Sequence, residues 1–255
     1  MTLGLPLSAL FAFLLALARV GAFLAFLPVP GFRAAPATAR VVLALAITIA
    51  LFPVWPALPN ELPAAGQLAA WALCEAGFGL VAGLAVGFLM EGFQLAMQIA
   101  GLQAGYGYAS TIDPNSEADT SVLQVVASLA TAVLFFTLGL DHELIRVLAA
   151  SFEKFPAGAW APTAASLDGV VRLGGVMFTT GLRLALPIIA LLMLIDFALA
   201  LVGRVQQQLQ LLSLAFPGKM AAALAILAVL APVVPKIFGS VAERVFVVLW
   251  RSLGV

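Results

Sequence analysis

Residues 176–201 read VMFTTGLRLALPIIALLMLIDFALAL, and only Arg183 and Asp196 carry a charge in this stretch. An α-helix needs about 20 mostly apolar residues to cross the hydrocarbon core of a bilayer, and this stretch is longer. The two charges cannot pair with each other along the helix, because about 20 Å of helix axis separates them. The stretch therefore predicts a membrane helix whose charges find partners on another helix, on another subunit or in water.

The composition of the whole chain agrees with this prediction. Hydrophobic residues make up 64% of the 255 residues and charged residues only 9%, whereas a soluble domain has about 25% charged residues. Basic and acidic residues balance at 12 each, so no net field attracts nucleic acid. We therefore expect lipid or protein to cover most of the surface, and we expect no nucleic-acid partner.

Further segments approach the length of a membrane span, at about 7–27, 39–51, 67–90, 122–140 and 220–234, the last resuming over 240–253. Proline ends or frays several of them, because it lacks an amide hydrogen and clashes with the preceding turn. Basic residues do not follow the usual cytoplasmic bias when the spans alternate. The sequence thus predicts an all-α membrane protein of about six long hydrophobic helices, some of them kinked or re-entrant.

Ionisable residues also lie inside other apolar segments, where Arg19 and Glu75 join Arg183 and Asp196. A charge at membrane depth is costly, so it usually pairs with another group or takes part in transport. We expect these residues to form contacts between helices or between subunits. A direct role in transport is the alternative.

A ridge of regularly spaced glycine and glutamate residues lies along the predicted helix over 67–90 and ends directly after it. Its members recur every four residues and are Glu75, Gly79, Gly83, Gly87 and Glu91. Residues at this spacing lie one above the other on a helix. Glycine at such positions lets a second helix backbone approach closely. The ridge therefore predicts a packing surface.

Polar residues interrupt the apolar pattern beyond this ridge. They form one stripe at Glu91, Gln94 and Gln98 and a second at Ser121, Gln124, Ser128 and Thr131. Polar stripes on apolar helices face either each other or a water-filled space. The sequence therefore predicts that the two stripes line such a space or meet.

Between the stripes, residues 101–114 read GLQAGYGYASTIDP. The glycines loosen a helix, and Asp113-Pro114 predicts a turn. Non-helical backbone at membrane depth is tolerated only where protein buries it or where it lines a cavity. The segment 101–114 is therefore a candidate constriction, with an ordinary external loop as the alternative. The candidate pore-lining residues are Gly101, Gln103, Gly105, Tyr106, Gly107, Tyr108, Thr111, Asp113 and Pro114.

The sequence offers little for catalysis. His142 is the single histidine and lies between Asp141 and Glu143. A metal site on a helix usually needs a second ligand four residues away or a further cluster, and neither is present. No serine lies in a recognisable nucleophile setting, and the single cysteine, Cys74, cannot form an internal disulfide. We predict a protein that is not an enzyme and that binds no cofactor or metal.

Several stretches, taken in order, resemble the FliR family, called SctT in virulence injectisomes. They lie at 19–21, 28–31, 40–41, 75–87, 101–114, 142–146, 151–152, 181–187 and 216–219. The chain departs from the family pattern at Asp141, near Asp196, at 207–210 and at Ala215. These departures concern local contacts, whereas the resemblance covers nearly the whole chain.

The resemblance implies a subunit of the type III protein export gate, assembled with FliP-like and FliQ-like subunits beside FlhB-like and FlhA-like export proteins. Residues 1–255 would form one membrane domain, with a FliP-like part over 1–175 and a FliQ-like helical hairpin over 176–255. The gate would conduct unfolded flagellar proteins across the bacterial inner membrane at the flagellar basal body. The glycine-rich segment, taken as 101–119, would be its plug and pore lining, and Lys219 would join the contact residues.

Two alternatives stay open beside this interpretation. One is the injectisome homologue, because a single sequence does not say which machine the gate serves. The other is an independent secondary transporter that uses Arg183 and Asp196 as a substrate or proton site. Transporter folds usually contain internal repeats, and the sequence shows no clear repeat.

Overall fold

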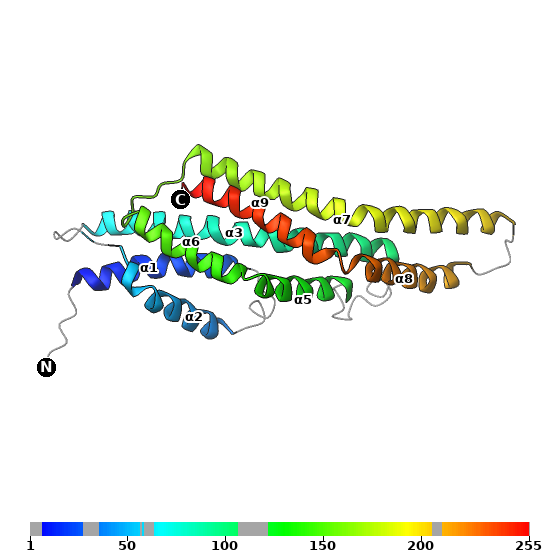
Figure 1. The fold of residues 1–255 in the computed structure, drawn as a ribbon, viewed down its shortest axis with the longest axis horizontal. Coiled ribbons are helices and arrows are strands. Elements are labelled where there is room, and N and C mark those ends of the chain that lie inside the picture. The colour runs from blue at the N-terminus through cyan, green and yellow to red at the C-terminus, as the bar shows by residue number, and fades with distance from the viewer. Residues whose placement is uncertain are drawn as a thin grey trace. The chain divides into compact units, whose positions relative to one another are not determined.

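A computed structural model describes residues 7–27, 36–56, 58, 64–106, 122–205 and 211–254, with the backbone alone at 205 and 211–214. Within these ranges the chain forms α-helices and one short 3-10 turn, and no strand (Figure 1). The helices are α1 Leu7–Phe26, α2 Ala37–Ala50, α3 Ala65–Ala104, α5 Val122–Thr137, α6 Leu140–Lys154, α7 Ala164–Val205, α8 Leu211–Leu230 and α9 Val234–Leu253, and the turn is η1 Phe52–Val54. The all-α prediction is confirmed.

Three of these helices, α1, α3 and α7, are long and apolar enough to cross a membrane. The pairs α5–α6 and α8–α9 are each bent at a short break, and counting each pair as one span raises the number to 5. The helix α2 is apolar but has only 14 residues. At about 1.5 Å per residue it is shorter than the roughly 30 Å hydrocarbon core. The segment predicted at 39–51 is therefore too short for a full span, since Pro36 precedes the helix and Pro53 follows it.

Proline and glycine account for the breaks between paired helices. Gly139, between α5 and α6, has a φ of 68°, which glycine adopts more readily than other residues. The break predicted near Pro232 is confirmed, because α8 ends at Leu230. The helix resumes at Val234 and not at 240 as predicted, since Pro235 is tolerated in the first turn of α9. Pro187, in contrast, lies inside α7 without ending it.

The helix α7 begins earlier than the apolar pattern predicts, at Ala164 instead of near 176. Thr163 and Ser166 cap its first turn: the Ser166 amide donates to Thr163 Oγ1 at 3.2 Å, and the Thr163 amide donates to Ser166 Oγ at 2.7 Å. Asp168 and Arg172 then pair on the helix surface at 2.7 Å. Polar residues thus extend this helix beyond its apolar part.

The chain divides into two compact units that alternate along the sequence. Unit 1 comprises Met1–Phe88, Phe135–Gly174 and Glu243–Val255, and unit 2 comprises Leu89–Leu134 and Gly175–Ala242. In unit 1, α1 and α2 pack side by side (Figure 1). Trp55 adds to this packing, since its ring lies 5.4 Å from that of Phe13 and its Nε1 donates to Thr48 O at 2.8 Å. The division into FliP-like and FliQ-like parts stays a prediction.

Candidate functional site

Arg19 on α1 is a fully buried cation in the core of unit 1. Its Nε donates a hydrogen bond to Oε2 of Glu75 on α3, whose side chain is also fully buried. Its Nη1 donates to Oγ of Ser151 on α6 at 2.7 Å. One guanidinium therefore connects three helices, and Glu75 neutralises its charge.

Aromatic rings and one backbone amide complete the surroundings of this ion pair. The guanidinium carbon of Arg19 lies 4.2 Å from the ring centroid of Phe152 and 4.7 Å from that of Phe78, a distance at which ring faces attract cations. The Gly158 amide donates to Oε1 of Glu75 at 2.9 Å, which fixes the loop between α6 and α7. We call Arg19, Glu75, Phe78, Ser151, Phe152 and Gly158 the arginine cluster.

The glycine ridge lies directly beside the arginine cluster. A Cβ on Gly79 would overlap the backbone carbonyl oxygen of Arg19, and one on Gly83 would lie 2.6 Å from the carbonyl oxygen of Phe23. The backbones of α1 and α3 thus touch at these two positions, and Gly87 is buried as well. Close backbone approach places the short Glu75 side chain within reach of Arg19.

In unit 2, the first residues of the candidate constriction, 101–104, form the last turn of α3. Gly105 has a φ of 91° and follows the last helical residue, Ala104. A Cβ on Gly105 would lie 2.6 Å from the ring of Phe216 on α8. Both the backbone angle and the packing therefore favour glycine here. The helix stops directly before residues 107–121, which lie outside the described residues.

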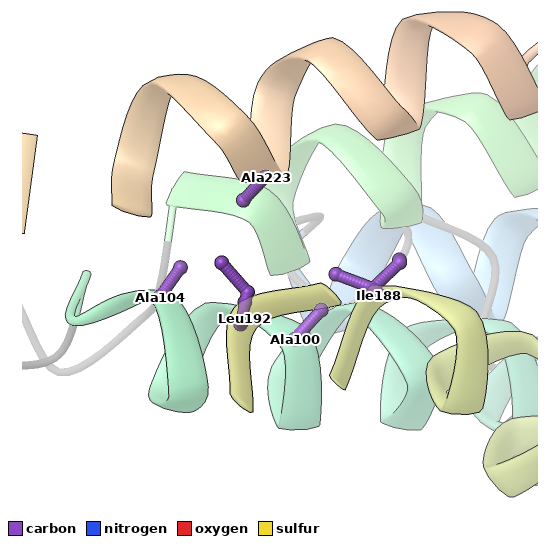
Figure 2. Packing of buried hydrophobic residues seen from close by; sticks show 5 residues of the cluster. All are labelled: Ala100, Ala104, Ile188, Leu192 and Ala223. Atoms are coloured by element: carbon purple, nitrogen blue, oxygen red, sulfur yellow. The ribbon is translucent and has the colours of Figure 1, made fainter. Parts of the chain in front are cut away.

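An apolar cluster holds this end of α3 against two other helices. Figure 2 shows Ala100 and Ala104 of α3 with Ile188 and Leu192 of α7 and Ala223 of α8, all fully buried. Tyr106 packs against this cluster, and its hydroxyl donates to the Met220 carbonyl at 3.4 Å. Small alanine side chains allow the three helices to approach closely here.

Three polar side chains of α3, α7 and α8 come together near this apolar cluster. The Lys219 ammonium of α8 lies 2.9 Å from Oδ1 of Asp196 on α7, and Nε2 of Gln103 on α3 donates to Oδ2 of Asp196 at 3.2 Å. We call Gln103, Asp196 and Lys219 the aspartate cluster. Asp196 thus finds its partners on two other helices, and the cluster anchors the last turn of α3 before residue 107.

Arg183, the other charged residue of the segment 176–201, has a different environment from Asp196. Its side chain is exposed on α7. Among the described residues, no acidic side chain lies within ion-pair distance of it. Arg183 and Asp196 therefore do not form one site, and within the described part of the chain the acidic one, Asp196, pairs with Lys219.

The polar stripes do not share one environment. Gln94 is buried, Gln98 is exposed and Glu91 lies between these extremes. On α5, Gln124 is half-buried, and the Ser128 hydroxyl donates to Val125 O of its own helix at 3.0 Å. Predicted site residues outside the described part of the chain are Gly107, Tyr108, Thr111, Asp113, Pro114 and Ser121.

His142 lies in the first turn of α6 with its side chain 78% exposed, and its Nδ1 is 3.2 Å from Asp141 Oδ1. Within the described ranges, no group of three or more metal-ligating side chains comes together. Sequence reasoning missed Ser151 and Gly158 as partners of the Arg19–Glu75 pair. Neither position carries a distinctive local signal, because a serine and a glycine are ordinary residues near a helix end.

A family model described as "Bacterial export proteins, family 1" matches residues 10–245 of this chain. The chain is 30% identical over 219 residues to the flagellar biosynthetic protein FliR of Escherichia coli (strain K12), a match that covers 86% of this chain and 83% of that protein. It is 26% identical over 214 residues to FliR of Bacillus subtilis (strain 168), covering 82% of each. It is also 26% identical over 182 residues to the Yop proteins translocation protein T of Yersinia pestis, covering 69% of each.

Proposed function

Since this chain belongs to the FliR/YscT (SctT) family of bacterial export proteins, we propose that it is a subunit of the flagellar type III export gate in the bacterial inner membrane. The observation that carries the proposal is the family match over residues 10–245, supported by a relative named for flagellar biosynthesis that is similar along most of both chains. Three apolar helices of membrane-spanning length agree with a place in a membrane. The chain takes part in protein transport and performs no chemistry of its own.

The segment after α3 is the gate's closing element in this proposal. Gly105 turns the chain out of the helix, and the aspartate cluster with the apolar cluster fixes the residues that precede the turn. A plug must be attached to a rigidly packed part of the protein, because a plug whose attachment moves does not keep the pore closed. Residues 101–106 would thus be the fixed base, and 107–119 the plug and pore lining.

Other subunits complete the gate. FliP-like and FliQ-like subunits would surround this chain, FlhB-like and FlhA-like proteins would adjoin it, and unfolded flagellar proteins would pass through. Large apolar side chains such as Val171, Leu194 and Val229 are exposed on the isolated chain. Exposed apolar surface of this extent favours cover by lipid and by partner helices.

The injectisome is the second candidate machine, because the chain is also similar to a protein named for Yop translocation. The flagellar machine is preferred, since the flagellar FliR of Escherichia coli is similar over a larger share of both chains. An independent transporter is a weaker rival, because the structure does not bring Arg183 and Asp196 into one site.

Deleting this gene is expected to stop secretion of flagellar hook and filament proteins while leaving their synthesis unchanged, as measured in culture supernatants and cell pellets. The wild-type gene and the His142→Ala gene should both restore secretion in full, because the His142 side chain is exposed and, within the described residues, contacts its neighbour Asp141. Normal flagellar secretion in the deletion strain would contradict the flagellar role. Loss of secretion with His142→Ala alone would instead point to chemistry at that histidine.

A further inference from the structure

Arg183 is a charge on an otherwise apolar, exposed surface of α7. Around it lie exposed side chains that share one side of the helix by their spacing. We call this surface the docking face, and its residues are Leu182, Arg183, Leu186, Ala190, Met193 and Phe197. Only 17% of the most apolar part of α7 is buried within the chain, whereas 56% of the corresponding part of α3 and 39% of that of α1 are buried. The isolated chain therefore leaves this helix largely uncovered.

Lipid alone cannot cover α7. Large apolar side chains are exposed on it from Val171 to Val202, a length of about 46 Å at about 1.5 Å per residue. The hydrocarbon core of a bilayer is roughly 30 Å thick, and even a tilt of about 40° leaves the exposed stretch too long. Part of this surface must therefore lie against protein or in water.

Each placement of the bilayer along α7 leaves one feature that lipid does not satisfy. If the bilayer covers the part after Arg183, the exposed side chains of Val171, Phe178 and Leu182 project beyond it. If it covers the part around Phe178 and Leu186, Arg183 lies in hydrocarbon without a counter-charge from the residues that the structure describes, which is costly. A protein helix along the docking face resolves the difficulty in both placements. It covers the exposed apolar side chains, and it can supply a negative charge to pair with Arg183.

We propose that the docking face binds an apolar helix of a different subunit, and that a carboxylate within that helix pairs with Arg183. The inference rests on the proposed function as a subunit of a multi-protein gate, and it names the chemistry that one neighbour must carry. The planar guanidinium binds a carboxylate through two parallel hydrogen bonds, so the contact fixes both register and orientation. Ala190 of the docking face, and the exposed Thr179 one turn before Arg183, are small enough to let the partner's backbone approach.

A second copy of this chain fits the docking face poorly. Within the described residues, Asp196 pairs with Lys219, Asp168 with Arg172 and Glu143 with Arg146. The remaining exposed carboxylates on helices, Glu153 and Glu243, lie on the polar surfaces of α6 and α9. None of these is an unpaired carboxylate on an apolar helix.

The test is copurification of the tagged chain from detergent-solubilised membranes of a strain that produces the whole gate. Arg183→Glu should lower the yield of copurified subunits at least about tenfold, because it places like charges opposite each other. Arg183→Lys should retain a substantial part of the yield, and Arg204→Glu, on the same helix, should retain all of it. A suppressor that restores assembly to Arg183→Glu should replace an acidic residue of the partner by a basic one.

A photo-crosslinking residue at position 186 identifies the occupant directly. It should form an adduct with a different subunit in the wild-type background and lose that adduct with Arg183→Glu. Adducts with lipid alone, or with a second copy of this chain, would overturn the inference, as would full copurification with Arg183→Glu. Those results leave the proposed function standing, whereas a wild-type chain that copurifies with no export subunit contradicts the proposed function itself.

Discussion

Glu75→Ala is expected to lower the free energy of unfolding by about 3–5 kcal/mol, because it leaves the guanidinium of Arg19 buried without a counter-charge. Both side chains are fully buried, so water cannot replace the lost carboxylate. The substitution also removes the acceptor for the Gly158 amide, which loosens the loop after α6. Thermal unfolding in detergent and the amount of folded chain in membranes measure the loss.

Two variants separate the charge effect from general damage. Glu143→Ala removes an exposed carboxylate that pairs with Arg146 at 2.9 Å, and an exposed pair contributes only about 0.2–1 kcal/mol. The double variant Arg19→Met with Glu75→Leu removes both charges, so it should be much more stable than Glu75→Ala alone. If Glu75→Ala unfolds at the wild-type temperature, the buried pair does not hold the three helices together.

Gly79→Ala is expected to destabilise the chain by about 1–3 kcal/mol, and Gly79→Leu by more, because no room exists for a side chain. The nearest atoms belong to the backbone of α1, including the Arg19 carbonyl oxygen and the Phe23 amide nitrogen. Backbone cannot move aside as a flexible side chain can, so α1 and α3 must separate. Their separation also lengthens the contact between Arg19 and Glu75. Thermal unfolding of the purified variants measures the total loss of stability.

Gly21→Ala is the matched control for this experiment. Gly21 also lies inside an apolar helix, α1, but a Cβ there would meet nothing within 4 Å. Alanine is favoured over glycine in a helix interior by about 1 kcal/mol, so this variant should be as stable as the wild type or slightly more stable. Equal stability of Gly79→Ala and Gly21→Ala would show that the ridge is not a contact between backbones.

The positions of most helices could be predicted from the sequence, because apolar runs and helix-ending prolines are local features. Runs of apolar residues located most of them, and Pro232 with Pro235 marked the break between α8 and α9. The predicted start of α7, near 176, was wrong by about three turns, since the helix begins at Ala164. Its first turns depend on capping by Thr163 and Ser166 and not on hydrophobicity. The helix α6 is not among the predicted segments, because only one of its faces is apolar.

Contacts between distant residues did not follow from the sequence. The spacing in α3 predicts that Gly79 and Gly83 face one neighbour, but it does not say that the neighbour is α1. The pairing of Asp196 with Lys219 and Gln103 depends on how α3, α7 and α8 come together. Such three-helix contacts are set by tertiary packing, which a single sequence encodes only indirectly.

The most direct test of the proposed gate is the ion conductance of cells that carry the assembled complex with residues 107–113 deleted. The deletion keeps Tyr106, which packs on the apolar cluster, so the base of the segment and the assembly should stay intact. If the segment closes the channel, the deletion should raise membrane conductance well above that of the wild type and of His142→Ala, while the other gate subunits still copurify. Conductance equal to the wild type in a fully assembled complex would contradict the claim that this segment closes the gate.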